Sequence, residues 1–81
     1  MIQKNQIHNN AWIEITDLKA VGGLLRHKRK KMGLTQNDVA GLCNVGIRFV
    51  SELENGKPTM QFDKALKVLN SLGFALGVRR R

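Results

Sequence analysis

The chain has 81 residues and a mass of 9.1 kDa, which is enough for one small domain, since a chain of this length buries only about 60% of its unfolded surface. It carries 14 Lys and Arg against 6 Asp and Glu, a formal net charge of +8, which favours a polyanionic partner. A single cysteine, Cys43, excludes a disulfide-stapled scaffold. No run approaches the roughly 18 apolar residues that span a membrane, so a soluble, cytoplasmic protein is expected.

The excess charge is confined to two short stretches of the sequence. Residues 1–25 and 32–78 each contain equal numbers of acidic and basic residues. The whole excess therefore comes from five residues in one cluster, which are Arg26, Lys28, Arg29, Lys30 and Lys31, and from three at the end of the chain, which are Arg79, Arg80 and Arg81.

The first 15 residues predict an N-terminal arm. They are rich in Asn and Gln up to Trp12, after which Ile13 and Ile15 alternate with Glu14 as in a short extended piece. Trp12 is expected to anchor this arm by packing.

A first helix is predicted from Thr16 or Asp17, either of which is a suitable N-cap, to a stop at Gly33. Apolar side chains recur on one of its faces at helical spacing: Leu18, Val21, Leu25 and Met32. The pair Gly22 and Gly23 weakens the intrinsic helix preference by about 1 kcal/mol per residue relative to Ala. Packing against other elements must therefore hold this helix.

Two short helices are predicted next, joined by a tight turn. Thr35 is a favourable N-cap for residues 36–42, and Asp38 complements the helix dipole in the first turn. The inward side chains are expected to be Val39, Ala40 and either Leu42 or Cys43. Asn44 tolerates the left-handed conformation that the turn demands. The second of these helices is predicted over residues 46–54.

A fourth helix is predicted over residues 61–72, with one apolar face made of Phe62, Ala65, Leu66, Leu69 and Leu72. The short apolar segment 74–78, interrupted by Gly77, favours a strand. A lone strand is not stable in water, so the expected pairing partner is the same strand of a second copy, through Phe74, Leu76 and Val78.

Two short helices joined by a three-residue turn, after a basic helix, form the pattern of a helix-turn-helix unit. The runs LTQNDVA at 34–40, NVG at 44–46 and VSELENGK at 50–57 resemble the phage-repressor and Xre type of helix-turn-helix transcription regulator. Within that superfamily, residues 29–36 and 49–57 look most like HipB-like antitoxins.

The resemblance covers residues 21–73 and implies an all-α, lambda-repressor-like bundle of four to five helices. To this bundle the apolar pattern of residues 74–78 adds a short C-terminal β-strand that is expected to pair across a dimer. The expected organisation is an N-terminal arm at 1–15, a helix-turn-helix DNA-binding domain at 16–73, and a dimerisation strand with a basic tail at 74–81.

Projection of the third helix at about 100° per residue separates a buried face around Val50 and Leu53 from an exposed face. The exposed face is expected to enter the major groove, and its predicted base-reading residues are Ile47, Arg48, Ser51 and Glu52. Arg48 suits guanine O6 and N7, Glu52 accepts from cytosine N4, and Ile47 packs on a thymine methyl. The resemblance implies the same role for Ile47, Arg48 and Glu52.

Phosphate contacts are expected at both ends of the unit. Thr35 and Gln36 lie at a helix N-terminus, where free N–H groups attract an anion. Asn55 and Lys57 follow the third helix, and Lys30 belongs to the basic cluster. That cluster could be a solvated helix face, but next to a helix-turn-helix pattern it is expected to face DNA.

Arg29 is expected to be structural. It projects onto the apolar face of the first helix beside Leu25, where a charge needs a partner. Glu54, near the buried edge of the third helix, is the natural candidate, and an Arg–Glu pair at these positions also looks like a recurring feature of the resembled family.

The sequence contains no pattern that predicts an enzyme, a cofactor or a metal site. It lacks a P-loop, paired cysteines and a nucleophile at catalytic spacing from a base, and His8 and His27 have no partner at metal spacing.

The expected function is sequence-specific repression of transcription by a homodimer on an inverted-repeat operator. The resemblance implies more specifically an antitoxin that represses its own operon and binds a HipA-like kinase toxin. Two alternatives stay open: a module that mainly neutralises its toxin by protein contact, and a stand-alone phage-type repressor without a toxin.

Overall fold

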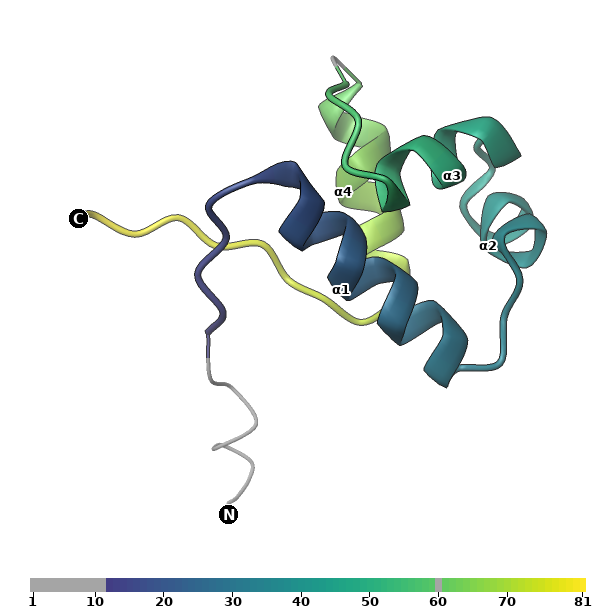
Figure 1. Ribbon diagram of the computed structural model, residues 1–81, viewed down its shortest axis with the longest axis horizontal. Helices are drawn as coiled ribbons and strands as arrows, with labels where there is room; N and C mark the ends of the chain where they lie inside the picture. Colours follow the sequence, from purple (N-terminus) through teal and green to yellow (C-terminus); the bar gives the residue numbers. More distant parts are fainter. Residues whose placement is uncertain (1–11, 60) are drawn as a thin grey trace.

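The computed structural model describes residues 12–59 and 61–81, which form four α-helices and, within those ranges, no strand (Figure 1). The helices are α1 (Leu18–Lys31), α2 (Gln36–Cys43), α3 (Ile47–Glu54) and α4 (Phe62–Ser71). The prediction of an all-α fold is confirmed, and each helix begins and ends close to the predicted residues. Residues 1–11 of the predicted arm, His8 among them, lie outside the described part of the chain.

The start of α2 is fixed by a capping box. The Thr35 hydroxyl accepts a hydrogen bond from the Asp38 N–H at 3.0 Å, and the Thr35 N–H donates to the Asp38 carboxylate at 2.8 Å. The backbone N–H of Thr35, followed by its hydroxyl, holds the pKa of Asp38 below its ordinary value. Asn44 ends α2 with a φ of 54°, the left-handed conformation predicted for the turn.

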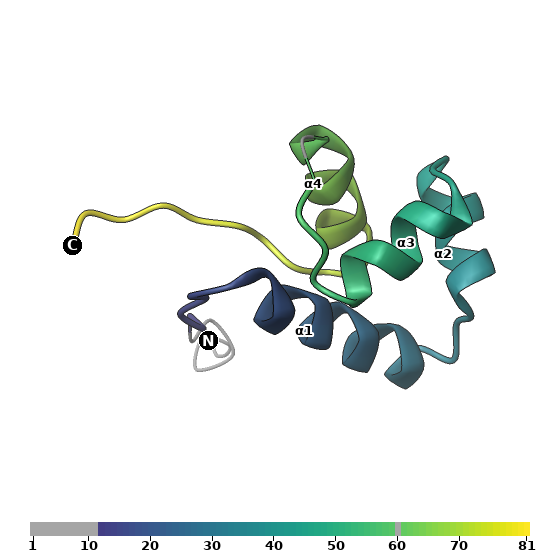
Figure 2. The ribbon, with the colours of Figure 1, turned by 45° about the horizontal axis from the view of Figure 1, so that its top comes forward.

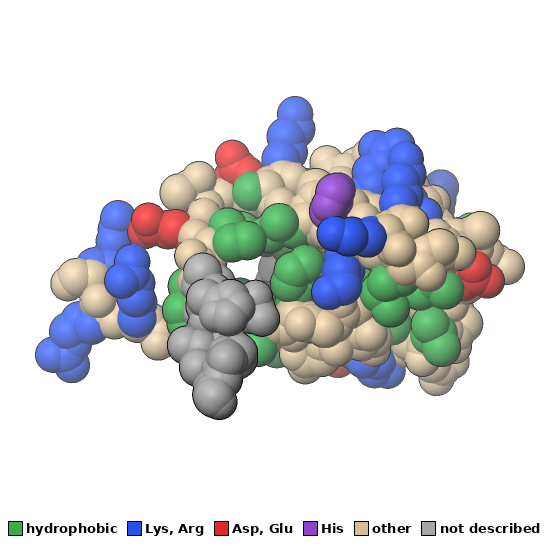
Figure 3. Space-filling model, turned by 90° about the horizontal axis from the view of Figure 1, so that it is seen from below, with side chains coloured by type: hydrophobic (Ala, Val, Ile, Leu, Met, Phe, Trp, Pro, Cys, Tyr) green, Lys and Arg blue, Asp and Glu red, His purple; other side chains and the backbone are tan. Residues whose placement is uncertain are grey.

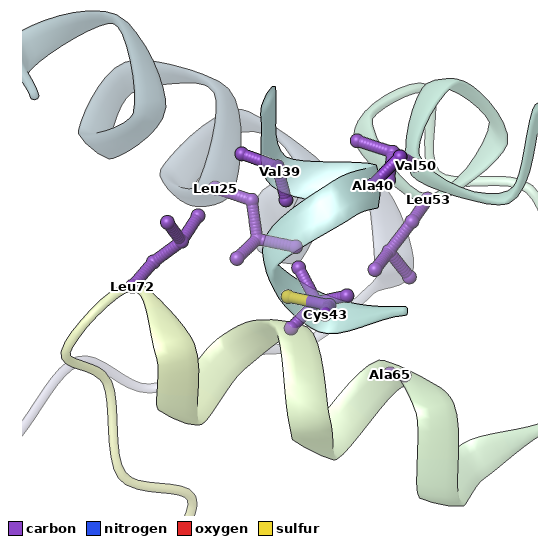
Figure 4. Packing of buried hydrophobic residues seen from close by; sticks show 9 residues of the cluster. Leu25, Val39, Ala40, Cys43, Val50, Leu53, Ala65 and Leu72 are labelled. Atoms are coloured by element: carbon purple, nitrogen blue, oxygen red, sulfur yellow. The ribbon is translucent and has the colours of Figure 1, made fainter. Parts of the chain in front are cut away.

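The core lies where the four helices meet. α3 packs against both α1 and α2, and α4 packs against α2 (Figure 2). Side chains from all four helices point into one interior (Figure 4), whose buried residues are Leu25, Val39, Ala40, Cys43, Val50, Leu53, Ala65, Val68 and Leu72. Cys43, not Leu42, is therefore the inward residue at the end of α2.

α1 and α3 approach each other at Gly22. A Cβ at this position would lie 2.3 Å from the carbonyl oxygen of Glu54 and 2.6 Å from that of Leu53, so only glycine fits. Gly23 points away from the body, and a Cβ there would meet no atom within 4 Å. The packing that holds α1 despite two glycines therefore occurs at the first of them.

Three residues predicted to face the core are exposed instead: Leu18, Met32 and Phe62. Each stands at the end of a helix. α1 has 14 residues and α3 has 8, so at about 1.5 Å per residue α1 is longer than the helix that it packs against. The spacing of apolar residues predicts which face of a helix turns toward the core, but it does not show how far along the helix the neighbouring element extends.

The predicted strand at 74–78 is not present. This segment leaves α4 as an extended chain (Figure 1), with Phe74 packed against the core and Leu76 and Val78 exposed. A strand is defined by a hydrogen-bonded neighbour, and the described part of this single chain offers none to residues 75–81.

Candidate nucleic-acid interface

The outward face of α3 carries the four predicted base-reading residues. Val50 and Leu53 are buried in the core, whereas the Arg48 side chain is 89% exposed and Ile47 is half exposed. Ser51 and Glu52 are partly exposed on the same side. A helix with one buried face and one free face of this kind is rigid and accessible, as insertion into a groove requires.

Glu52 lies between two cations on this face. Its carboxylate is 3.0 Å from the Lys57 ammonium and 4.0 Å from the Arg48 guanidinium. Exposed pairs of this kind contribute only about 0–1 kcal/mol. Arg48 and Lys57 can therefore exchange Glu52 for a base edge or a phosphate at little cost.

The buried pair predicted between Arg29 and Glu54 is present. Arg29 Nε donates to Glu54 at 2.6 Å and Nη2 donates at 3.1 Å, while Nη1 donates to the Leu34 carbonyl at 2.8 Å. The hydrogen bond from Arg29 to Glu54 raises the pKa of Arg29. One guanidinium thus ties α1 to the end of α3 and to the loop before α2.

Gln36 has a role that the sequence did not reveal. Its side-chain amide donates to the Glu54 carboxylate at 3.0 Å, so it belongs to the buried network. The N–H groups of Thr35 and Asp38 are used inside the capping box. At the start of α2 this leaves the backbone N–H groups of Gln36 and Asn37 as donors for an anion.

The basic cluster of α1 divides into separate surfaces. Lys28 Nζ stands 5.3 Å from the centre of the Phe74 ring, a cation–π contact that holds the start of the C-terminal segment. Arg26, Lys30 and Lys31 are exposed, and the charge of Arg26 helps to lower the pKa of Glu54. No feature of the sequence distinguished Lys28 from its neighbours.

Other kinds of site find no support in the described residues. They contain no group of three or more His, Cys, Asp or Glu side chains placed to hold a metal ion. None of the described helices has the length and hydrophobicity needed to cross a membrane.

A family model described as helix-turn-helix matches residues 25–78, which include α2, the turn at Asn44 and α3. The chain belongs to the helix-turn-helix family. This helix-turn-helix protein is 45% identical over 58 residues to the uncharacterized HTH-type transcriptional regulator y4mF of Sinorhizobium fredii, an alignment that covers 72% of this chain and 76% of that protein. It is thus a DNA-binding transcriptional regulator, of a family that is not a class of enzymes, and the predicted resemblance to the phage-repressor and Xre type is confirmed.

Two solved structures share its fold. One is a chain described as MDT Protein, and the other comes from a structure of the HipA-HipB-O2-O3 complex. Each has a TM-score of 0.74 and 19% sequence identity, over 85% of this chain and 97% of that chain. At this level of identity the match establishes a HipB-like fold for the helix-turn-helix protein.

Proposed function

We propose that this regulator is a sequence-specific repressor that binds an inverted-repeat operator as a homodimer. The observation that carries the proposal is the outward face of α3, where Arg48 and Glu52 stand on a helix whose opposite face is locked into the core. Arginine and carboxylate side chains discriminate guanine and cytosine by hydrogen bonds in the major groove.

Phosphate contacts on both sides of α3 would hold the helix in register. Asn55 and Lys57 follow its C-terminus, and on the other side the start of α2 offers the backbone N–H groups of Gln36 and Asn37, since the Thr35 N–H is used in the capping box. Lys30 adds an exposed charge on α1. Each neutralised phosphate steepens the dependence of log affinity on log salt by about 0.9.

The C-terminal segment is the proposed dimer contact. Leu76 is 50% exposed and Val78 is 98% exposed, and residues 75–81 have no backbone hydrogen bonds in the described part of the chain. Antiparallel pairing with the same segment of a second copy would cover these side chains and satisfy that backbone. Two α3 helices related by the twofold axis would then reach half-sites about 34 Å apart.

A narrower version of the proposal is an antitoxin that autoregulates its operon and binds a HipA-like kinase toxin. It is supported by the fold shared with a chain of the HipA-HipB-O2-O3 complex. A kinase-like toxin gene beside this one, and a stable complex of the two purified products, is the expected finding. Their absence contradicts the antitoxin and favours the stand-alone repressor. A complex that forms without specific DNA binding favours the toxin-neutralising module.

The base-reading role is tested by Arg48→Ala. Loss of one bidentate contact in each half-site is expected to weaken binding by about 1–3 kcal/mol, or roughly 5- to 150-fold, per half-site, and to remove discrimination at one base pair of each. Binding to random DNA should change little. Fluorescence anisotropy with the operator and its single-base variants measures both quantities.

Lys57→Ala is the matched control, because a phosphate contact carries no sequence information. It should weaken binding to all sequences alike and reduce the salt slope by about 1. If Arg48→Ala instead lowers affinity uniformly across sequences, Arg48 is not a base reader.

A further inference from the structure

The N-terminal arm and the C-terminal segment meet at Trp12 and Gly77, 65 positions apart in the sequence. A Cβ on Gly77 would lie 2.6 Å from two carbons of the Trp12 ring. The indole therefore rests on bare backbone, where any other residue would push it away. This contact joins the described start of the arm to the segment proposed to form the dimer.

Around this contact lies an open, mostly apolar groove of about 1560 Å³. Its walls come from residues 12–16, α1, α4 and the C-terminal segment, and they combine apolar side chains such as Ile13, Leu69 and Leu76 with the charged Glu14, Lys28 and terminal arginines. Figure 3 looks onto this side, where apolar side chains gather and Lys and Arg side chains lie at the end of the chain and over the body. Apolar surface gathered on one side of a small chain marks an interface.

The C-terminal segment has two different faces, because side chains alternate in an extended chain. Gly77 lies against the Trp12 ring, although Trp12 itself is 73% exposed. Phe74 packs on the core. Leu76 and Val78 lie two and four positions further along the chain, on the same side of the segment, and both are largely exposed. Among the described residues, Trp12 thus contacts the Gly77 side of the segment, while Leu76 and Val78 on the other side are exposed.

We propose that Trp12 acts as a clasp that holds the C-terminal segment extended, and that the backbone of this segment pairs with the same segment of a second copy. This inference rests on the proposed homodimer and adds the N-terminal arm to its interface. Trp12 is a positioning residue. It holds the C-terminal segment at Gly77, which stabilises the dimer, and the dimer in turn binds DNA more tightly than a single copy.

Charge favours an antiparallel arrangement of the two copies. Each chain ends in Arg79, Arg80 and Arg81. Antiparallel pairing centred on Leu76 places Phe74 opposite Val78 of the other copy and moves the two arginine triplets to opposite ends. A parallel arrangement would put six positive charges side by side, which electrostatic repulsion opposes.

The test measures the dimer dissociation constant of the full chain by sedimentation equilibrium over a dilution series. Trp12→Ala, and Gly77→Ala, which adds a Cβ under the ring, are each expected to weaken the dimer at least about tenfold. Trp12→Phe keeps a ring over Gly77 and should restore most of the affinity. Leu42→Ala and Gly41→Ala, at exposed positions on α2, are matched controls and should leave the constant unchanged.

Because Trp12 is the only tryptophan, its emission provides a second readout. Its emission should shift to longer wavelength on dilution to monomer and in the chain truncated after residue 73. The Leu42→Ala variant should show the same emission as the wild type at each concentration. Far-UV circular dichroism confirms that each variant remains helical, and if Gly77→Ala does not fold, Trp12→Ala decides.

Truncation after residue 73 separates the clasp from the homodimer. Loss of the dimer in the truncated chain, with normal dimers in Trp12→Ala and Gly77→Ala, would overturn the clasp and leave the homodimer standing. A dimer that survives truncation, or a wild-type chain that is monomeric at every concentration, would overturn both.

Discussion

Glu54→Gln is expected to lower the free energy of unfolding by about 3–5 kcal/mol, because it leaves the Arg29 guanidinium buried without a counter-charge. A domain of this size has a total stability of roughly 4–12 kcal/mol. The variant should therefore unfold at least about 12 °C below the wild type, as measured by thermal and urea unfolding monitored at 222 nm.

Glu52→Gln, on the exposed side of the same helix, is the matched control. Glu52 pairs only with the exposed Arg48 and Lys57 side chains, so the loss should stay below about 1 kcal/mol. Equal effects of the two substitutions would contradict a special role for the buried pair. A double replacement, Arg29→Met with Glu54→Leu, should recover much of the lost stability, since no unpaired charge remains.

The contribution of Glu54 should depend on pH. Burial by itself raises the pKa of Glu54, but hydrogen bonds from Arg29 and Gln36 and the charges of Arg29 and Arg26 outweigh it, so the pKa lies below its ordinary value. Stability from a carboxylate with a lowered pKa is fully present above the ordinary pKa of about 4.3 and is lost as the pH falls through the lowered one. The difference between wild type and Glu54→Gln should therefore shrink in acid.

Gly22→Ala is expected to destabilise the protein by about 2–3 kcal/mol or more. Its Cβ would overlap the carbonyl oxygens of Leu53 and Glu54, which are backbone atoms and cannot rotate away. α1 and α3 must separate, at the place where Arg29 bonds Glu54. The cost of such overpacking exceeds the gain of about 1 kcal/mol in helix preference.

The neighbouring Gly23→Ala should have the opposite sign. A Cβ there meets no atom within 4 Å, so only the gain of about 0.5–1 kcal/mol from helix preference and a less flexible unfolded chain remains. Both variants change the unfolded chain alike, and the difference between their urea midpoints isolates the contact with α3. Changes of equal sign and size would show that the two helices do not approach at Gly22.

Local rules recovered much of the fold because the relevant interactions are short in sequence. Thr35 and Asp38 are three positions apart and form their capping box within one turn. Asn44 adopts its left-handed conformation for reasons contained in the turn itself. The pairing of Arg29 with Glu54 could be predicted although it joins residues 25 positions apart, because a charge on an apolar face requires a partner and Glu54 projects near the buried edge of the third helix.

Interactions between elements account for what the sequence did not reveal. Gly22 and Gly23 are identical in the sequence, and only the crossing of α1 with α3 distinguishes them. Gln36 has the side chain of a phosphate contact, yet it donates to Glu54 because α3 ends beside it. Lys28 belongs to a cluster of five basic residues but lies over Phe74. Each of these roles depends on which element lies next to which.

The C-terminal segment depends in the same way on a neighbour, but here the proposed neighbour is a second copy of the chain. Apolar composition predicted a strand at 74–78, and the chain there is extended and exposed, as a strand without its partner would be. Secondary structure that requires a second molecule cannot form within one copy. Pairing of the C-terminal segments of two copies therefore stays a proposal, which dilution of the full chain and truncation after residue 73 test.

The most direct test of the central claim, that the outward face of α3 reads a symmetric operator, is selection of duplexes from a random DNA pool by the full-length protein. We predict enrichment of an inverted repeat with half-site centres about 10 base pairs apart, and loss of a guanine preference in each half when Arg48→Ala is used instead. Enrichment of no consensus sequence, or of one that Arg48→Ala leaves unchanged, would contradict the account.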